Sequence, residues 1–174
     1  MSELKIFICG FMGAGKSTFS GHLQLAESYD LDEVIFAKYA AGYAHLGEYI
    51  AAIGWPRFRH LEGLELELFC TRDLATSVLA LGGGALNQRT LALIRGRPEH
   101  LLVWLDTPFN ICWQRITGDK VRPLAVKSKK ELAVLYAARC EFYSQAHLKL
   151  GIDQQNGISQ LADLLAYLPP GKIL

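Results

Sequence analysis

The residues that most clearly indicate chemistry form a glycine-rich segment, GFMGAGKS at positions 10–17. This segment fits the pattern G-x-x-x-x-G-K-[ST], and it follows a predicted strand and opens a predicted helix, as the pattern requires. Glycines allow backbone N–H groups to curl around phosphate oxygens, and the helix N-terminus adds partial positive charge. The segment therefore predicts a binding site for a nucleoside triphosphate. A plain glycine turn followed by a solvated lysine is the alternative.

The side chains of this phosphate cradle have distinct expected roles. We expect Lys16 to reach the β and γ phosphates and the Ser17 hydroxyl to bind Mg²⁺. The residues expected to contact the nucleotide here are Gly13, Ala14, Gly15, Lys16, Ser17 and Thr18. What becomes of the γ phosphate then depends on the residues that follow the other strands.

Two carboxylates, Asp30 and Asp32, follow the second predicted strand. Phosphoryl transfer needs a carboxylate that takes or orients the proton of the acceptor hydroxyl. Because the two residues are two positions apart at a strand end, Asp32 can face the acceptor while Asp30 holds Mg²⁺ through water. An aspartate at a strand-to-helix junction also serves in many proteins only as an N-cap, which is the alternative here.

Arginine and glycine supply the features of an acceptor pocket. A guanidinium group grips a carboxylate with two parallel hydrogen bonds, so two arginines aimed into one pocket suit a small carboxylic acid. Glu62 lies three residues beyond Arg59 on the same predicted helical face, where it can pair with Arg59 and orient it. The triplet at residues 82–84 would let the backbone approach a ligand where a Cβ would obstruct. A surface arginine and a bare turn are the alternatives.

Alternating strands and helices must position these residues. The periodicity predicts strands at residues 5–9, 27–30, 77–81, 100–105 and 148–152. It predicts helices at residues 16–25, 32–43, 46–53, 58–69, 108–116, 131–146 and 158–167, with a polar loop at 117–130. Because parallel neighbours need a crossover helix, this order predicts an α/β fold with a five-stranded, mostly parallel sheet. Ligands bind beyond the carboxyl ends of such strands, where the cradle, the aspartates and the glycine triplet fall.

Length and composition set further limits. At 174 residues the chain has room for one domain, and its net charge of +1 argues against a nucleic-acid-binding surface. Its apolar runs are too short for a membrane span. The four cysteines lack metal-ligand spacing and are expected to be free thiols. The amino-terminal residues lack the pattern of a secretory signal, so we expect a cytoplasmic protein. Its small size favours a monomer.

Several separate segments then match a known family in order. The cradle is followed by Asp30-Leu31-Asp32, FRHLE at 58–62, GGGA at 82–85, VRPL at 121–124, and Arg139 with Tyr143. Together these segments resemble the shikimate kinase family, the small P-loop enzymes of aromatic biosynthesis, over nearly the whole chain. Each of the later segments is weak alone, and their order and separation make the match specific.

The resemblance implies a fold and an activity. The expected fold is a three-layer sandwich of the P-loop NTPase type, a single domain over residues 1–174 with a helical acceptor-binding insert at about 32–62 and a lid at about 117–130. The expected reaction is ATP- and Mg²⁺-dependent phosphorylation of the 3-hydroxyl of shikimate in the pathway to chorismate. The expected ligands are ATP and shikimate, with no nucleic acid or membrane partner.

The resemblance also implies residue roles. Catalytic roles fall on Lys16, Asp32 as the base, and Arg122 in the lid. Acceptor contacts fall on Asp32, Arg59, Gly82, Gly83, Gly84 and Arg139. Metal contacts fall on Ser17 and Asp30. Nucleotide contacts beyond the cradle fall on Arg115, Arg122 and Gln155, with Gln155 and its neighbour Asn156 placed in a loop facing the adenine.

The match departs from the family pattern at several positions. An ungapped alignment would put Glu33 and Ile35 where the two aspartates are expected. Ile50 stands where the family often has an aromatic residue, and Cys140-Glu141 replaces a proline-containing turn. The alternative functions are a different small P-loop kinase, acting on gluconate or a nucleoside monophosphate, and a nucleotide-binding regulatory module without turnover.

Overall fold

Five parallel strands form the sheet in the computed structural model, which describes residues 4–117 and 127–168. The strands are β1 (Lys5–Cys9), β2 (Glu27–Asp30), β3 (Ser77–Ala80), β4 (His100–Leu105) and β5 (Leu148–Leu150). Their order across the sheet is β2-β3-β1-β4-β5, and every neighbouring pair is parallel. The predicted five-stranded parallel sheet is therefore confirmed.

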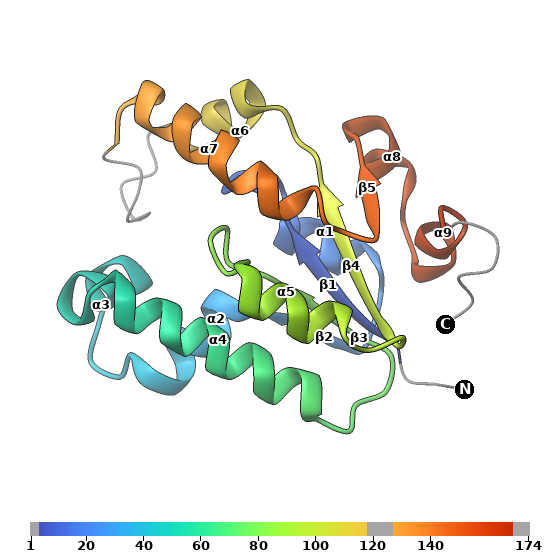
Figure 1. Ribbon diagram of the computed structural model, residues 1–174, viewed down its shortest axis with the longest axis horizontal. Helices are drawn as coiled ribbons and strands as arrows, with labels where there is room; N and C mark the ends of the chain where they lie inside the picture. The colour runs from blue at the N-terminus through green and yellow to red at the C-terminus, as the bar shows by residue number, and fades with distance from the viewer. Residues whose placement is uncertain (1–3, 118–126, 169–174) are drawn as a thin grey trace.

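Helices connect and cover the strands (Figure 1). They are α1 (Lys16–His22), α2 (Leu31–Tyr39), α3 (Leu46–Ile53), α4 (Trp55–Thr71), α5 (Gln88–Arg95), α6 (Phe109–Ile116), α7 (Lys129–Tyr143), α8 (Ile152–Gly157) and α9 (Leu161–Leu165). In Figure 1, α2, α3 and α4 lie to one side of the carboxyl ends of the strands, and α6 and α7 lie to the other. Within the described ranges, no helix is long and apolar enough to cross a bilayer.

The inner strands owe their stability to burial on both faces. Every residue of β1, β3 and β4 is buried, which is why their sequences are apolar without interruption after a first polar residue. The edge strand β2 has the sequence ESYD and is partly exposed, so its sequence signal is weak. Register brings Cys9 beside Trp104 and Asp30 beside Ala80, so the strands end at one common edge.

Several predicted elements differ from the observed ones. Helix α5 was not predicted, although Asn87 and Thr90 form a capping box at its start and Gly96 follows it. The predicted loop around Gln155 is wrong, because that residue lies in α8. The predicted strand to residue 152 ends at Leu150, and the last helix begins at Leu161. All four cysteines are free, and three of them are buried.

Candidate active site

The phosphate cradle joins β1 to α1. Gly13 and Gly15 have φ angles of +79° and +92°, a left-handed conformation that glycine adopts without strain. A Cβ at Gly13 would lie 2.7 Å from the carbonyl oxygen of Cys112, so α6 also requires glycine there. Backbone conformation and packing thus both explain the glycines of the motif.

Lys16 closes over the cradle. Its Nζ donates hydrogen bonds to the carbonyl oxygens of Gly10 at 3.0 Å and Phe11 at 3.1 Å. Burial lowers the pKa of Lys16, while the nearby carboxylates of Asp32 and Asp30 raise it. The ammonium group is therefore held at the loop, next to the carboxylates expected to serve the acceptor and the metal.

Asp30 uses its two carboxylate oxygens differently. Oδ1 accepts hydrogen bonds from the backbone N–H groups of Asp32 at 2.9 Å and Glu33 at 3.4 Å, which caps α2. Oδ2 accepts from the hydroxyl of Ser17 at 2.5 Å. The N-cap interpretation and the metal interpretation are thus compatible. A hydroxyl and a carboxylate oxygen that meet beside the cradle are ligands that suit Mg²⁺.

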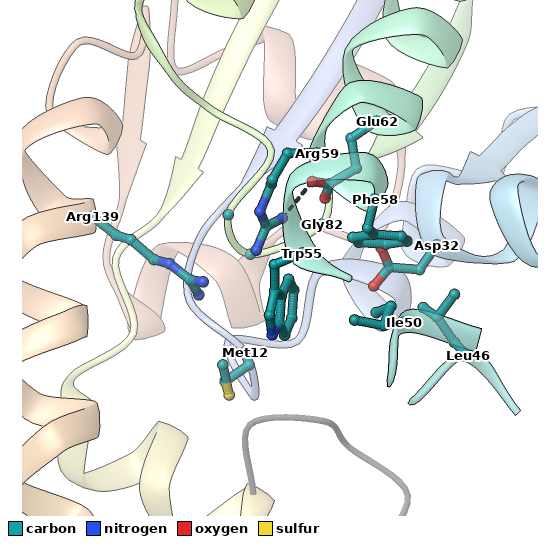
Figure 2. A pocket seen from close by; sticks show the side chains of 12 residues that line it. Met12, Asp32, Leu46, Ile50, Trp55, Phe58, Arg59, Glu62, Gly82 and Arg139 are labelled. Atoms are coloured by element: carbon teal, nitrogen blue, oxygen red, sulfur yellow. Dashed lines mark hydrogen bonds and ion pairs between the residues drawn. The ribbon is translucent and has the colours of Figure 1, made fainter. Parts of the chain in front are cut away.

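A pocket opens at the same edge of the sheet, beside the cradle (Figure 2). Its lining combines apolar side chains from the insert with charged groups and the glycine triplet. The lining residues are Met12, Asp32, Leu46, Ile50, Trp55, Phe58, Arg59, Glu62, Gly82, Gly83, Gly84 and Arg139. All six residues expected to contact the acceptor are therefore brought together in one pocket.

The gapped and ungapped alignments with the family assign the metal and acceptor positions to different residues, and the structure places these residues differently. Asp32 lines the pocket, whereas Ile35 is fully buried in the core and Glu33 is exposed. The geometry therefore favours Asp30 and Asp32 over Glu33 and Ile35 as the residues that face metal and acceptor.

Arg59 is oriented by three neighbours on its own helix. Its guanidinium forms a short ion pair with Glu62, one turn further along α4 (Figure 2). It also lies over the rings of Trp55, at 4.8 Å, and Phe58, at 5.7 Å. Burial raises the pKa of Glu62 to about 7, although the nearby Arg59 lowers it. The predicted pairing of Glu62 with Arg59 is confirmed.

Arg139 reaches the pocket from α7, on the opposite side (Figure 2). Its guanidinium lies 5.4 Å from the ring centre of Phe11, and its Nη1 is buried without a hydrogen-bond partner among the described residues. Burial lowers the pKa of Arg139, and the neighbouring positive charge of Arg59 lowers it further. A buried donor beside a second cation is suited to an anion.

Gly84 is the point where the two arginines converge. A Cβ built there would lie 2.5 Å from Nη2 of Arg59 and 2.8 Å from Nη2 of Arg139. Two guanidinium groups from residues 80 positions apart in sequence therefore approach the same point beside the Gly84 backbone. This arrangement can grip a carboxylate with several parallel hydrogen bonds.

The residues expected around the nucleotide base occupy varied positions. Nη1 of Arg115 donates to the cradle carbonyl of Gly13 at 3.0 Å, which places this arginine beside the nucleotide loop. Nε2 of Gln155 donates to the carbonyl of Leu150 at 2.8 Å, so this amide group holds α8 against β5. Arg122 lies outside the described residues.

Some site residues were not found by sequence reasoning. Trp55 lies four residues before Arg59, and this helical spacing was a usable signal for a shared face. The Thr107 hydroxyl donates to the cradle carbonyl of Ala14 at 3.1 Å, a contact across 93 residues that no local pattern shows. Tyr143 was named through the family resemblance but given no role; its hydroxyl donates to the carbonyl of Gly83, again over a long separation.

The phosphate cradle and the cation-lined pocket lie at one edge of the sheet. They are suited to bind the phosphates of a nucleotide and a small anionic acceptor side by side. This arrangement defines the class as a small-molecule kinase of the P-loop type. A family model for shikimate kinases matches residues 12–166. The chain belongs to the shikimate kinase family.

Individual relatives agree over nearly the full length of the chain. The chain is 35% identical to the shikimate kinase of Staphylococcus haemolyticus over 154 residues, covering 86% of each. It is 30% identical to that of Persephonella marina over 166 residues, covering 92% of this chain and 96% of the relative. Among solved structures, shikimate kinase from Acinetobacter baumannii in complex with shikimate matches with a TM-score of 0.80 at 30% identity, covering 97% of both chains.

Proposed function

We propose that the protein transfers the γ-phosphoryl group of ATP to the 3-hydroxyl of shikimate, giving shikimate 3-phosphate and ADP. The observation that carries this proposal is the convergence of Arg59 and Arg139 at Gly84, beside the phosphate cradle. The relative from Acinetobacter baumannii, whose structure contains shikimate, supports the same acceptor.

The acceptor is held by its carboxylate in this mechanism. Arg59 and Arg139 bind that group, and the backbone of Gly82, Gly83 and Gly84 lies against the hydroxyl-bearing ring. Asp32 accepts or orients the proton of the hydroxyl that attacks. Holding the reacting groups in line in this way accounts for a large share of the rate enhancement in phosphoryl transfer.

The nucleotide is held by the other half of the site. The cradle N–H groups bind the phosphates, while Lys16 exchanges its two carbonyl partners for phosphate oxygens and stabilises the transferring group. We assign the same charge-stabilising role to Arg122, and contacts with the nucleotide base to Arg115 and Gln155. Ser17 and Asp30 are suited to hold Mg²⁺, which neutralises phosphate charge when bound.

A coupled assay of ADP release tests the proposal. We expect ADP release that requires both Mg²⁺ and shikimate, with gluconate and nucleoside monophosphates inactive as acceptors. The methyl ester of shikimate tests the carboxylate contact, because it keeps every hydroxyl and removes the charge. Its KM should rise at least about 30-fold, as expected from about 2 kcal/mol for a lost buried charge contact. ATP binding without transfer to any acceptor would favour a regulatory module.

The assembly and the cellular location stay predictions from the sequence. We propose a cytoplasmic monomer that binds ATP and shikimate. Gel filtration with light scattering, run with and without both ligands, tests the monomeric state, and a dimer at micromolar concentration would contradict it.

A further inference from the structure

We propose that Tyr143 is a positioning residue for the phosphoryl acceptor. Its hydroxyl joins the glycine triplet to the helix that carries Arg139, and thereby sets the distance between the acceptor pocket and the phosphate cradle. This inference rests on the proposed function.

The contacts of Tyr143 connect two acceptor-binding elements. Tyr143 is the last residue of α7 and is only 2% exposed. Its hydroxyl donates a short hydrogen bond to the carbonyl of Gly83, across 60 residues of sequence. Arg139 lies four residues earlier on the same helix, on the same face. Burial raises the pKa of Tyr143, so the phenol stays a proton donor throughout the working pH range.

Tyr143 also lies in the electrostatic environment of Arg139. Burial lowers the pKa of Arg139, and the neighbouring phenol of Tyr143 opposes this effect. The Tyr143 hydroxyl and the Arg139 guanidinium thus meet at Gly83: the hydroxyl donates to the Gly83 carbonyl, and Nη1 of Arg139 lies 3.2 Å from a Cβ built there. Losing the hydroxyl would leave the Gly83 carbonyl without its donor, next to the guanidinium of Arg139.

Gly83 contacts both the acceptor arginine and the phosphate cradle, so the hydrogen bond from Tyr143 affects the placement of both. A Cβ at Gly83 would lie 3.2 Å from Nη1 of Arg139 and 3.3 Å from the backbone nitrogen of Met12. The backbone at Gly83 therefore lies close to both Arg139 and the phosphate cradle. Because in-line transfer depends on sub-ångström placement of the reacting groups, a shift of this peptide should lower the rate of transfer.

Tyr136 provides a matched control. It lies on the same helix, and its hydroxyl donates to the carbonyl of Thr107 at 3.1 Å. It does not line the acceptor pocket. Tyr143→Phe and Tyr136→Phe therefore remove the same chemical group and the same kind of hydrogen bond, but only the first removes it beside the acceptor.

The experiment measures kcat, the KM for shikimate, the KM for ATP and the melting temperature of both variants. We expect Tyr143→Phe to raise the shikimate KM about tenfold and to lower kcat, while the ATP KM stays within about twofold. Tyr136→Phe should lower the melting temperature comparably and leave the shikimate KM within about twofold. If Tyr143→Phe changes the shikimate KM no more than Tyr136→Phe does, Tyr143 is merely structural and the inference is wrong.

A double variant tests whether Tyr143 acts through its neighbour. We expect the combined effect of Tyr143→Phe and Arg139→Lys on shikimate KM to be at least about threefold smaller than the product of the single effects. Fully multiplicative effects would overturn the proposed link. The wild-type assay separates the two proposals: absent shikimate-dependent ADP release refutes the proposed function, and with it this inference. An active wild type with an unaffected Tyr143→Phe variant refutes the positioning role alone.

Discussion

Substitution of Gly84 by alanine offers the sharpest separation of acceptor binding from folding. The added Cβ would lie 2.5 Å from Nη2 and 2.7 Å from Cζ of Arg59, and 2.8 Å from Nη2 of Arg139. The backbone at Gly84 is outside the left-handed region, so alanine can adopt it. The perturbation therefore acts on the two guanidinium groups.

The size of the effect follows from these distances. Carbon and nitrogen atoms in contact prefer separations of roughly 3.5–4 Å, so both guanidinium groups must withdraw by about 1 Å. A displacement of that size at a positioning contact costs about 10²-fold in rate. This factor corresponds to about 2.7 kcal/mol, within the range of about 2–5 kcal/mol for a buried charge contact. We expect kcat/KM for shikimate to fall about 100-fold.

Folding and nucleotide binding should be preserved. The atoms that must move are the ends of two long side chains at a pocket, which can swing aside without displacing the core. The melting temperature of Gly84→Ala should therefore stay within about 2 °C of the wild type, and the ATP KM within about twofold.

Gly63→Ala is the matched control for this variant. Gly63 lies in α4, the helix that carries Arg59, and a Cβ there meets nothing within 4 Å. Alanine in a helix interior should add about 0.5–1 kcal/mol of stability, with kinetic constants unchanged. The reasoning is refuted if Gly84→Ala leaves kcat/KM for shikimate within threefold of wild type, or if ATP binding falls in parallel.

Three further predictions concern polar and charged side chains of the site. Asp32→Asn should lower kcat by about 10²-fold or more, because it removes the proposed base, and an unchanged single-turnover rate would place the base elsewhere. Burial raises the pKa of Glu62 from the ordinary 4.5, expected in the unfolded chain, to about 7 in the folded protein. The contribution of its protonated form to the free energy of unfolding is therefore full below about pH 4.5 and is lost as the pH rises through about 7. The melting temperature of the wild type relative to Glu62→Gln should therefore fall between pH 5 and pH 8, and a constant difference would contradict this. Ser17→Ala should raise the Mg²⁺ concentration needed for half-maximal activity at least about fivefold, measured at saturating ATP; an unchanged requirement would remove Ser17 from the metal site.

Local patterns account for the features that the sequence predicted well. The cradle was identified because its glycines, lysine and serine are adjacent in sequence. The pairing of Arg59 with Glu62 followed from a three-residue helical spacing. The strands β1 and β4 were recognisable because burial on both faces makes their sequences apolar after the first residue.

Features that depend on distant contacts were less accessible. Arg139 joined Arg59 in the prediction only through a family resemblance, because no spacing rule links residues 80 positions apart. The sequence left two registers open for the carboxylates, and burial of Ile35 distinguishes them. Helix α8 was predicted as the end of a strand and a loop, because its six residues are too few to show a periodic pattern.

The two roles of Asp30 determine how the site would respond to substitution of this residue during evolution. One of its oxygens begins the helix that bears Asp32, and the other faces Ser17. Asparagine there could preserve the helix start while discarding the negative charge, whereas alanine would forfeit both. A substitution at this one position can thus remove a ligand for Mg²⁺ while leaving the helix that carries Asp32 in place. A chain with asparagine there would keep the fold of the site and lose metal-dependent transfer.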